Sequence, residues 1–129
     1  MTLHKICILG AGTLGSRVAL QSAISGFTVS IFDLKQASLD SAILTMQKIL
    51  RQLVRGGKLT ETQVPEILQR IQPTLDLAEA LKDADLVNES VTEDVTIKKS
   101  LWTEVGKLAA PHTWLTTNTS YLLPSQFAE

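Results

Sequence analysis

The sequence predicts an α/β fold, a doubly wound and mostly parallel sheet with helices on both faces. Strand-like apolar runs alternate with amphipathic helical segments along the chain, which is typical of this class. The first run, Lys5 to Leu9, has the pattern of a strand buried on both faces. Three glycines follow it at once, and a helical pattern follows them. Strand, glycine turn and helix in this order set the framework for the remaining elements.

The glycines stand at G-x-G-x-x-G spacing, which after a strand and before a helix is typical of dinucleotide binding. The first allows a sharp turn, the second leaves room for a pyrophosphate, and the third lets the helix pack closely on the strand. The N-terminus of the helix offers N–H groups and a partial positive charge to phosphates. We therefore predict a Rossmann-type domain whose cofactor contacts Gly10, Ala11, Gly12, Thr13, Leu14 and Gly15.

The second predicted strand, Thr28 to Phe32, follows Gly26, which we expect to end the first helix. Asp33 follows this strand, about twenty residues after the first glycine, where an acid can accept hydrogen bonds from the adenosine ribose hydroxyls. The same charge would repel a 2′-phosphate. We therefore predict NAD rather than NADP as the cofactor. The alternative is that Asp33 is only a solvated strand end or a helix cap.

A helical hairpin is predicted between the second and third strands. Its first helix runs from about Gln36 to about Val54 with an apolar stripe, and Gly56 and Gly57 end it. Its second helix starts at the capping-box sequence 60–63 and continues to Ile71. The insertion is larger than a crossover needs, so it provides either extra packing or a lip over the cofactor or substrate cleft.

The rest of the chain continues the alternation. We predict an edge strand at 73–75, a short helix at 76–81, a strand at 85–91, a helix at 95–109, a strand at 114–118 and a further helix from Leu123. In such a sheet the ligand lies beyond the carboxyl ends of the strands, where the strand order reverses. The segments that meet there are 10–15, Asp33, 91–93 and 118–120.

Composition narrows the class of protein. The chain has 129 residues, a net charge of −1 and one cysteine. This length fits one domain, and the charge points to neither nucleic acid nor an anionic membrane surface. We expect no transmembrane span, no signal peptide, no metal site and a cytoplasmic location. Cys7 cannot form an internal disulfide and is expected to be a small buried hydrophobe.

Several motifs together resemble the amino-terminal domain of L-3-hydroxyacyl-CoA dehydrogenases. They are the glycine turn, Phe32-Asp33, the segment 84–93 with its E-x-V-x-E block, and Thr117-Asn118-Thr119-Ser120. The hairpin tip matches as well, and the resemblance covers essentially all of the chain. It implies an oxidoreductase of fatty acid metabolism that uses NAD to oxidise a 3-hydroxy group to a ketone, or the reverse. The substrate would be a 3-hydroxyacyl-CoA or a related 3-hydroxy acid.

The resemblance also implies roles for three further residues. Glu93 and Lys98 would lie near the nicotinamide half of the cofactor, and Ser120 would contact both the substrate oxygen and the nicotinamide. A hydroxyl can hold the reacting oxygen in line for hydride transfer, which makes Ser120 the candidate catalytic residue, although not the base. The alternatives are a favourable helix start for Glu93, a solvent-facing side chain for Lys98 and a turn residue for Ser120.

Two positions depart from the family pattern. Asn88 stands where an aliphatic residue is usual, so we expect its amide to be hydrogen-bonded or near a sheet end. Ile49 replaces a polar residue that in some members lies near coenzyme A, although Lys58 or Arg55 could contact the phosphates instead. The requirement for coenzyme A is therefore open.

Family members continue with a sixth strand that carries a catalytic histidine, and with a helical domain that forms the dimer. We expect residues 1–129 to be the NAD-binding part of a longer, homodimeric protein, able to bind the cofactor but without appreciable dehydrogenase activity alone. Two alternatives remain. The sequence 122–125 resembles a branch that reduces keto acid esters without coenzyme A, and a non-catalytic NAD-sensing module would need only the glycine turn and Asp33.

Overall fold

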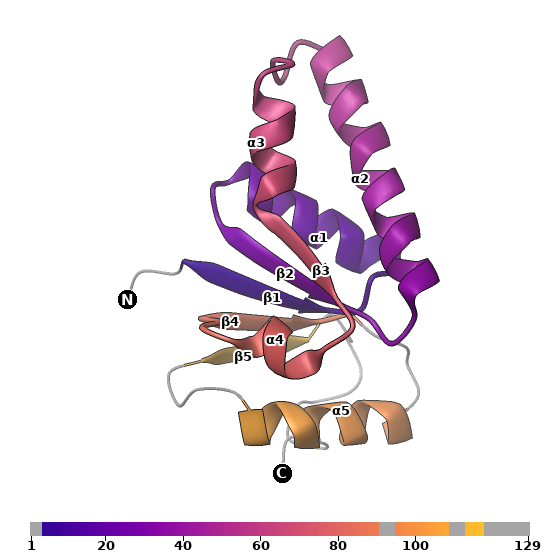
Figure 1. Ribbon diagram of the computed structural model, residues 1–129, viewed down its shortest axis with the longest axis vertical. Helices are drawn as coiled ribbons and strands as arrows, with labels where there is room; N and C mark the ends of the chain where they lie inside the picture. The colour runs from indigo at the N-terminus through magenta and orange to yellow at the C-terminus, as the bar shows by residue number, and fades with distance from the viewer. Residues whose placement is uncertain (1–3, 91–94, 109–112, 118–129) are drawn as a thin grey trace.

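The computed structural model describes residues 4–90, 95–108 and 113–117. The sheet has five strands in the order β3-β2-β1-β4-β5, and all four neighbouring pairs are parallel (Figure 1). The elements are β1 (Lys5–Leu9), α1 (Thr13–Ile24), β2 (Thr28–Phe32), α2 (Gln36–Arg55), α3 (Gln63–Gln69), β3 (Ile71–Thr74), α4 (Leu77–Leu81), β4 (Leu86–Glu89), α5 (Val95–Leu108) and β5 (Trp114–Thr117).

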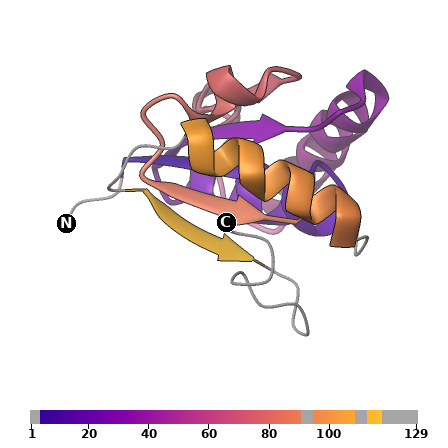
Figure 2. The same ribbon diagram turned by 90° about the horizontal axis from the view of Figure 1, so that it is seen from below.

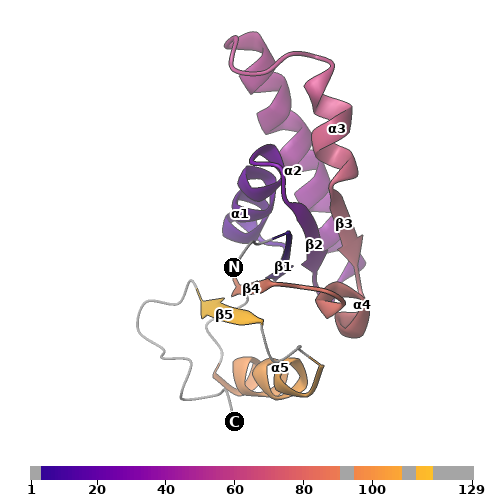
Figure 3. The same cartoon turned by 90° about the vertical axis from the view of Figure 1, so that its left-hand side faces the viewer.

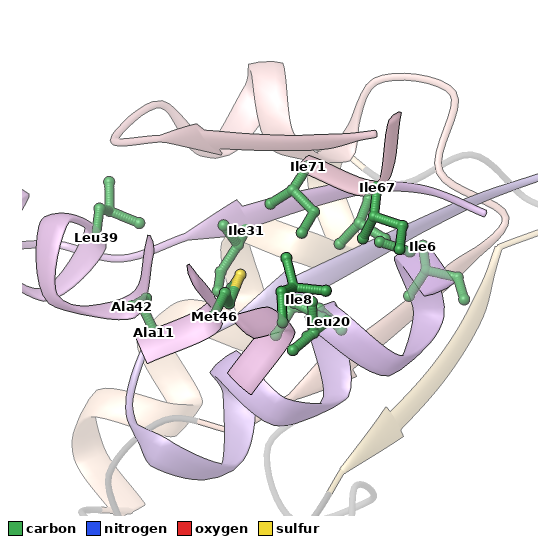
Figure 4. Close-up of a cluster of buried hydrophobic side chains, with 14 residues drawn as sticks. Ile6, Ile8, Ala11, Leu20, Ile31, Leu39, Ala42, Met46, Ile67 and Ile71 are labelled. Carbon is green, nitrogen blue, oxygen red and sulfur yellow. The ribbon is translucent and has the colours of Figure 1, made fainter. Parts of the chain in front are cut away.

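Helices cover both faces of the sheet, which confirms the doubly wound fold. Helices α1, α2 and α3 lie on one side and α5 on the other (Figures 1 and 3), and Figure 2 shows α5 running across its face. Strand β1 alternates between the two cores, because successive side chains of a strand point to opposite faces. Ile6 and Ile8 join the core under α1 to α3 (Figure 4), whereas Cys7 and Leu9 join the core with α4 and α5.

The helix ends agree with the predicted turn chemistry. Gly26 follows α1 with a φ of 101°, and Gly57 follows α2 with a φ of 75°, a region that glycine enters without steric cost. The N–H of Thr60 donates to Oε1 of Gln63 at 2.8 Å, which is one of the two bonds of the predicted capping box. Helix α3 nevertheless starts later than predicted, at Gln63, and its N-cap Thr62 makes no side-chain cap bond. The predicted helical hairpin after β2 is therefore present (Figure 1).

The boundary between α3 and β3 was predicted incorrectly. Ile71 is the first residue of β3 rather than the end of the helix, and Leu75 lies beyond the strand. Ile71 is buried and pairs with Val29, whose N–H donates to the carbonyl of Arg70 at 2.8 Å. Helical periodicity suggested a longer helix because Ile67 and Ile71 stand four residues apart and face the same core.

The other predicted elements are correct to within a residue or two. Asp76 precedes α4 instead of joining it, and its carboxylate caps that helix by accepting from two backbone N–H groups. Pro73 lies on the edge strand β3, as expected for a residue without an N–H. Trp102 is buried in the core that α4 and α5 share with the sheet. Residues 91, 109 and 118, which the predictions placed in elements, and the helix from Leu123 lie outside the described residues.

Gly15 provides a test of how closely α1 packs against β1. A Cβ at this position would lie 1.9 Å from the carbonyl oxygen of Gly10. Since backbone must move to relieve this overlap, Gly15→Ala should lower the free energy of unfolding by at least about 1–3 kcal/mol. Gly106→Ala is the matched control, because its Cβ meets no atom within 4 Å; this helical change should stabilise by about 0.5–1 kcal/mol. Urea unfolding of both variants measures the difference, and equal stabilities would contradict the packing.

The buried thiol of Cys7 should make the free energy of unfolding fall with rising pH in the alkaline range. Burial raises the pKa of Cys7 from its ordinary value of 9.0 to about 11. The unfolded chain therefore loses this proton first, so stability should fall as the pH rises from about 9 to about 11, by roughly 1.4 kcal/mol per pH unit for one proton. Unfolding of the wild type and of Cys7→Ala across this range isolates the contribution. Parallel pH profiles for the two proteins would refute it.

Candidate cofactor site

A groove of about 1020 Å³ lies at the carboxyl edge of the sheet. The chain supplies residues to it from the ends of four strands: Gly10 after β1, Phe32 and Asp33 at β2, Leu75 after β3, and Ser90 after β4. Strands β1 and β4 are neighbours although they are not consecutive in the chain, so the strand order reverses between them. Ligands of open α/β sheets bind at this kind of edge.

The glycine turn has the geometry that the motif predicts. Gly10 has a φ of 108°, which favours glycine, and its N–H donates to the carbonyl of Phe32 at 2.7 Å. Gly12 is exposed, and a Cβ there would meet no atom within 4 Å. Gly15 packs directly against Gly10. The bare backbone at Gly12 therefore faces space that a phosphate group can enter.

The N-terminus of α1 borders this open space. The helix has 12 residues, and its first repeating hydrogen bond joins the N–H of Ser16 to the carbonyl of Gly12 at 2.8 Å. The N–H groups at the start of a helix have no partner within it, and here Thr13 and Leu14 are exposed. These donors and the helix dipole suit a pyrophosphate, so the residues present fit a dinucleotide.

Asp33 is half-buried beside the glycine turn and is not a freely solvated strand end. Its Oδ2 accepts the N–H of Ala11 at 2.9 Å, and its Oδ1 accepts the N–H of Lys35 at 3.0 Å. Lys35 is the N-cap of α2 and makes no side-chain cap bond. The carboxylate therefore joins the end of β2 to the turn after β1, and Asp33 lines the groove.

A second, smaller pocket of about 330 Å³ lies between the start of α1 and one side of α2. Its wall is rich in hydroxyl groups, which suit polar ligand groups. The sequence analysis did not identify it, although small hydroxyl residues repeat at helical spacing beside the apolar stripe of α2. The hydroxyl residues are Thr13, Ser16, Ser38, Ser41 and Thr45.

The sequence analysis also missed the apolar wall of the larger groove. This wall joins the segments after β2 and β3 to helices α4 and α5, and it could cover a flat aromatic ring. This wall could not be predicted from the sequence, because exposed leucines are common at loops and helix ends and do not by themselves indicate a binding surface. The residues are Leu34, Leu75, Leu77, Leu101 and Leu108.

The remaining predicted site residues lie at or beyond the limits of the described structure. Lys98 falls in α5, but its side chain is outside the described part, and so are Glu93 and Ser120. Asn88 behaves as expected, because Oγ of Ser90 donates to its Oδ1 at 3.2 Å one residue before the end of β4. Within the described ranges, no three metal-ligating side chains of His, Cys, Asp or Glu form a cluster.

Comparison with known proteins identifies the family. The model of the 3-hydroxyacyl-CoA dehydrogenase NAD binding domain matches residues 5–129. The chain belongs to this family. It is therefore the NAD-binding domain of a 3-hydroxyacyl-CoA dehydrogenase-like oxidoreductase, which confirms both the resemblance found in the sequence and the cofactor predicted from the glycine turn and Asp33.

Individual relatives agree with this assignment. The chain is 32% identical over 128 residues to the Probable 3-hydroxybutyryl-CoA dehydrogenase of Bacillus subtilis, covering 99% of the chain and 44% of that protein. The structure of 3-hydroxybutyryl-CoA dehydrogenase from Escherichia coli K12 superimposes with a TM-score of 0.92 at 32% identity, over 98% of this chain and 27% of that one. A diketoreductase acting on dicarbonyl compounds matches with a TM-score of 0.87 at 35% identity, over 98% of this chain and 46% of that one.

The NAD-binding domain thus spans less than half the length of these relatives. Among the helices that the structure describes, none is long and apolar enough to cross a membrane.

The open space at Gly12 provides a test of this NAD-binding domain that is separate from folding. Gly12 has a φ of −73°, so Gly12→Ala introduces no backbone strain and should change stability by less than about 1 kcal/mol. The new methyl group would occupy the approach to the backbone and should weaken NADH binding at least about tenfold. Calorimetric titration with NADH measures this loss, with Gly106→Ala as the control. Unchanged affinity would place the phosphates elsewhere.

Proposed function

We propose that the full-length protein transfers hydride between NAD and the 3-position of a 3-hydroxyacyl or 3-ketoacyl thioester of coenzyme A. The observation that carries the proposal is the groove at the carboxyl edge, where an open glycine turn and the carboxylate of Asp33 lie together. The family assignment supports the reaction class. Because the chain covers 44% of its Bacillus subtilis relative, we propose the reaction for a full-length protein and not for this domain alone.

The chain's own residues would then have distinct roles. The turn from Gly10 to Gly15 holds the pyrophosphate, and Asp33 accepts hydrogen bonds from the adenosine ribose and repels a 2′-phosphate. Glu93 and Lys98 orient the nicotinamide half. Bound NAD supplies the centre that accepts or donates the hydride.

Ser120 follows β5 in the chain and would act on the substrate. Its hydroxyl holds the reacting oxygen in line with the hydride path, which lowers the entropic part of the barrier. The hydroxyl proton is not labile near neutral pH, so Ser120 does not serve as the base. The proton of the substrate hydroxyl must therefore go to a group elsewhere in the full-length protein.

We also propose that the full-length protein is a homodimer.

The hairpin supports a nucleotide-bearing substrate. Lys48, Arg51 and Arg55 are exposed and follow one another at three- and four-residue steps along α2, so they share one face. Ser41, which lines the hydroxyl-rich pocket beside the glycine turn, precedes them on the same side. These cations lie in the second half of α2, a helix that runs from beside the glycine turn toward the hairpin tip (Figure 1). This cationic face could bind the phosphates of coenzyme A without the polar residue that Ile49 replaces.

A keto acid or keto ester reductase without coenzyme A is the second candidate. The observation that favours it is the 35% identity to a diketoreductase, whose structure matches 98% of the chain. Under this alternative the cations on α2 would be solvent-exposed surface charges. The two candidates therefore differ in what they predict for these side chains.

Asp33 should decide between the two nicotinamide cofactors. Asp33→Ala should reduce the preference for NADH over NADPH, because it removes both the ribose acceptor and the like-charge repulsion, an effect of about 2–3 kcal/mol or 30- to 160-fold in relative affinity. Calorimetric titration of wild type and variant with both nucleotides measures the ratio. Asp40→Ala, an exposed acid on α2, is the control. An unaltered ratio would exclude Asp33 from cofactor selection.

The cationic face should decide between the two substrate classes. In the full-length protein, replacing Lys48, Arg51 and Arg55 together by alanine should raise KM for acetoacetyl-CoA about tenfold, as expected for three exposed phosphate contacts. The KM for the acetoacetyl thioester of N-acetylcysteamine, which lacks the nucleotide, should stay unchanged. Lys82→Ala, an exposed cation beside α4, is the control. Equal KM values for acetoacetyl-CoA in variant and wild type would favour the keto acid reductase.

A further inference from the structure

The peptide groups of Ala11 are held on both sides by buried or half-buried side chains. Its N–H donates to Oδ2 of Asp33 at 2.9 Å, and its carbonyl accepts the hydroxyl of Ser16 at 3.2 Å. Ala11 is 4% exposed and Ser16 is 2% exposed, so water competes little for either bond. The side chains of Asp33 and Ser16 therefore hold Ala11 from both sides, and we call these two hydrogen bonds the clamp.

The neighbouring residues leave this turn little freedom to shift. The N–H of Gly10 is bonded to the carbonyl of Phe32, one residue before Asp33. On the other side, Gly15 packs against the carbonyl of Gly10. Two consecutive bonds thus tie the turn to the end of β2, and only the bond to Asp33 comes from a side chain.

We infer that Asp33 and Ser16 are positioning residues that set the shape of the phosphate-binding turn before any nucleotide binds. The clamp occupies the N–H of Ala11, so the donors left for a pyrophosphate belong to the residues that follow. A turn held in its binding shape loses less entropy when the ligand arrives. The part of this inference that concerns affinity rests on the proposed role of the turn in nucleotide binding.

The clamp is compatible with ribose recognition by the same carboxylate. An ionised carboxylate has about four acceptor positions, and the N–H groups of Ala11 and Lys35 use two of them. Asp33 would therefore select the nucleotide and shape its phosphate site at once. Substitutions that remove the carboxylate should weaken phosphate binding as well as changing cofactor preference.

Amide hydrogen exchange in the nucleotide-free protein tests the clamp directly. In Asp33→Ala the N–H of Ala11 should exchange at least about tenfold faster than in wild type, since it loses its acceptor. Asp33→Asn retains one acceptor oxygen for the N–H groups of Ala11 and Lys35 and should therefore keep part of the protection. The N–H of Gly10, bonded to Phe32, reports whether the fold is intact in each variant. Equal exchange of Ala11 in the wild type and in Asp33→Ala would overturn the clamp.

Binding of 2′,3′-dideoxy-ADP, which has the diphosphate but no ribose hydroxyls, separates positioning from ribose recognition. Asp33→Ala and Asp33→Asn remove the same charge, so their difference reports the acceptor for Ala11. We expect Asp33→Ala to bind this probe about fivefold more weakly than Asp33→Asn, and Ser16→Ala to bind it about fivefold more weakly than wild type.

The outcomes can be told apart. Equal affinities of the two Asp33 variants, and of Ser16→Ala and wild type, would limit Asp33 to the ribose and overturn the positioning role. A wild-type protein that binds neither ADP nor the dideoxy probe would contradict nucleotide binding by the turn, while the exchange of Ala11 would still decide whether the clamp exists. If Asp33→Ala does not fold, Ser16→Ala and Asp33→Asn carry the test.

Discussion

The close approach of α1 to the end of β1 is the contact on which the rest of this structure depends. A side chain at Gly15 would overlap the carbonyl oxygen of Gly10, so glycine is required there for the helix to start at this distance. The approach brings the N-terminus of α1 to the carboxyl edge of the sheet. The same approach places the glycine turn, which connects β1 to α1, where its N–H groups donate hydrogen bonds to Phe32 and Asp33 at the end of β2.

The sheet arranges the other segments around this contact. Because β4 pairs with β1 on the side opposite β2, the strand order reverses beside β1, and the glycine turn stands at the carboxyl end of that strand. The ends of four parallel strands then meet at one groove. The two cores hold the strands rigidly from both faces, so the turn is set on elements that are buried rather than on a free loop.

The helical hairpin adds a polar surface to this arrangement. The side of α2 nearest α1 carries hydroxyl groups beside the glycine turn, and the exposed face continues with cations toward the tip. The apolar stripe of α2 packs on the sheet core through residues such as Leu39 and Met46. One helix therefore contributes both to the core and to a polar surface that begins at the cofactor groove.

The sequence by itself determined the fold class, the glycine turn, the inserted hairpin and the position of Asp33, because these depend on local periodicity and on glycine chemistry. It could not determine where α3 ends and β3 begins. Ile67 and Ile71 have helical spacing in the sequence, but Ile71 pairs with Val29 in the sheet and is therefore part of a strand. It also could not show that Asp33 and Ser16 hold Ala11 from both sides, or that leucines from separate segments form one wall of the groove. These features were decided by the tertiary structure, because they join residues that are distant in the chain and local patterns carry no information about such pairs.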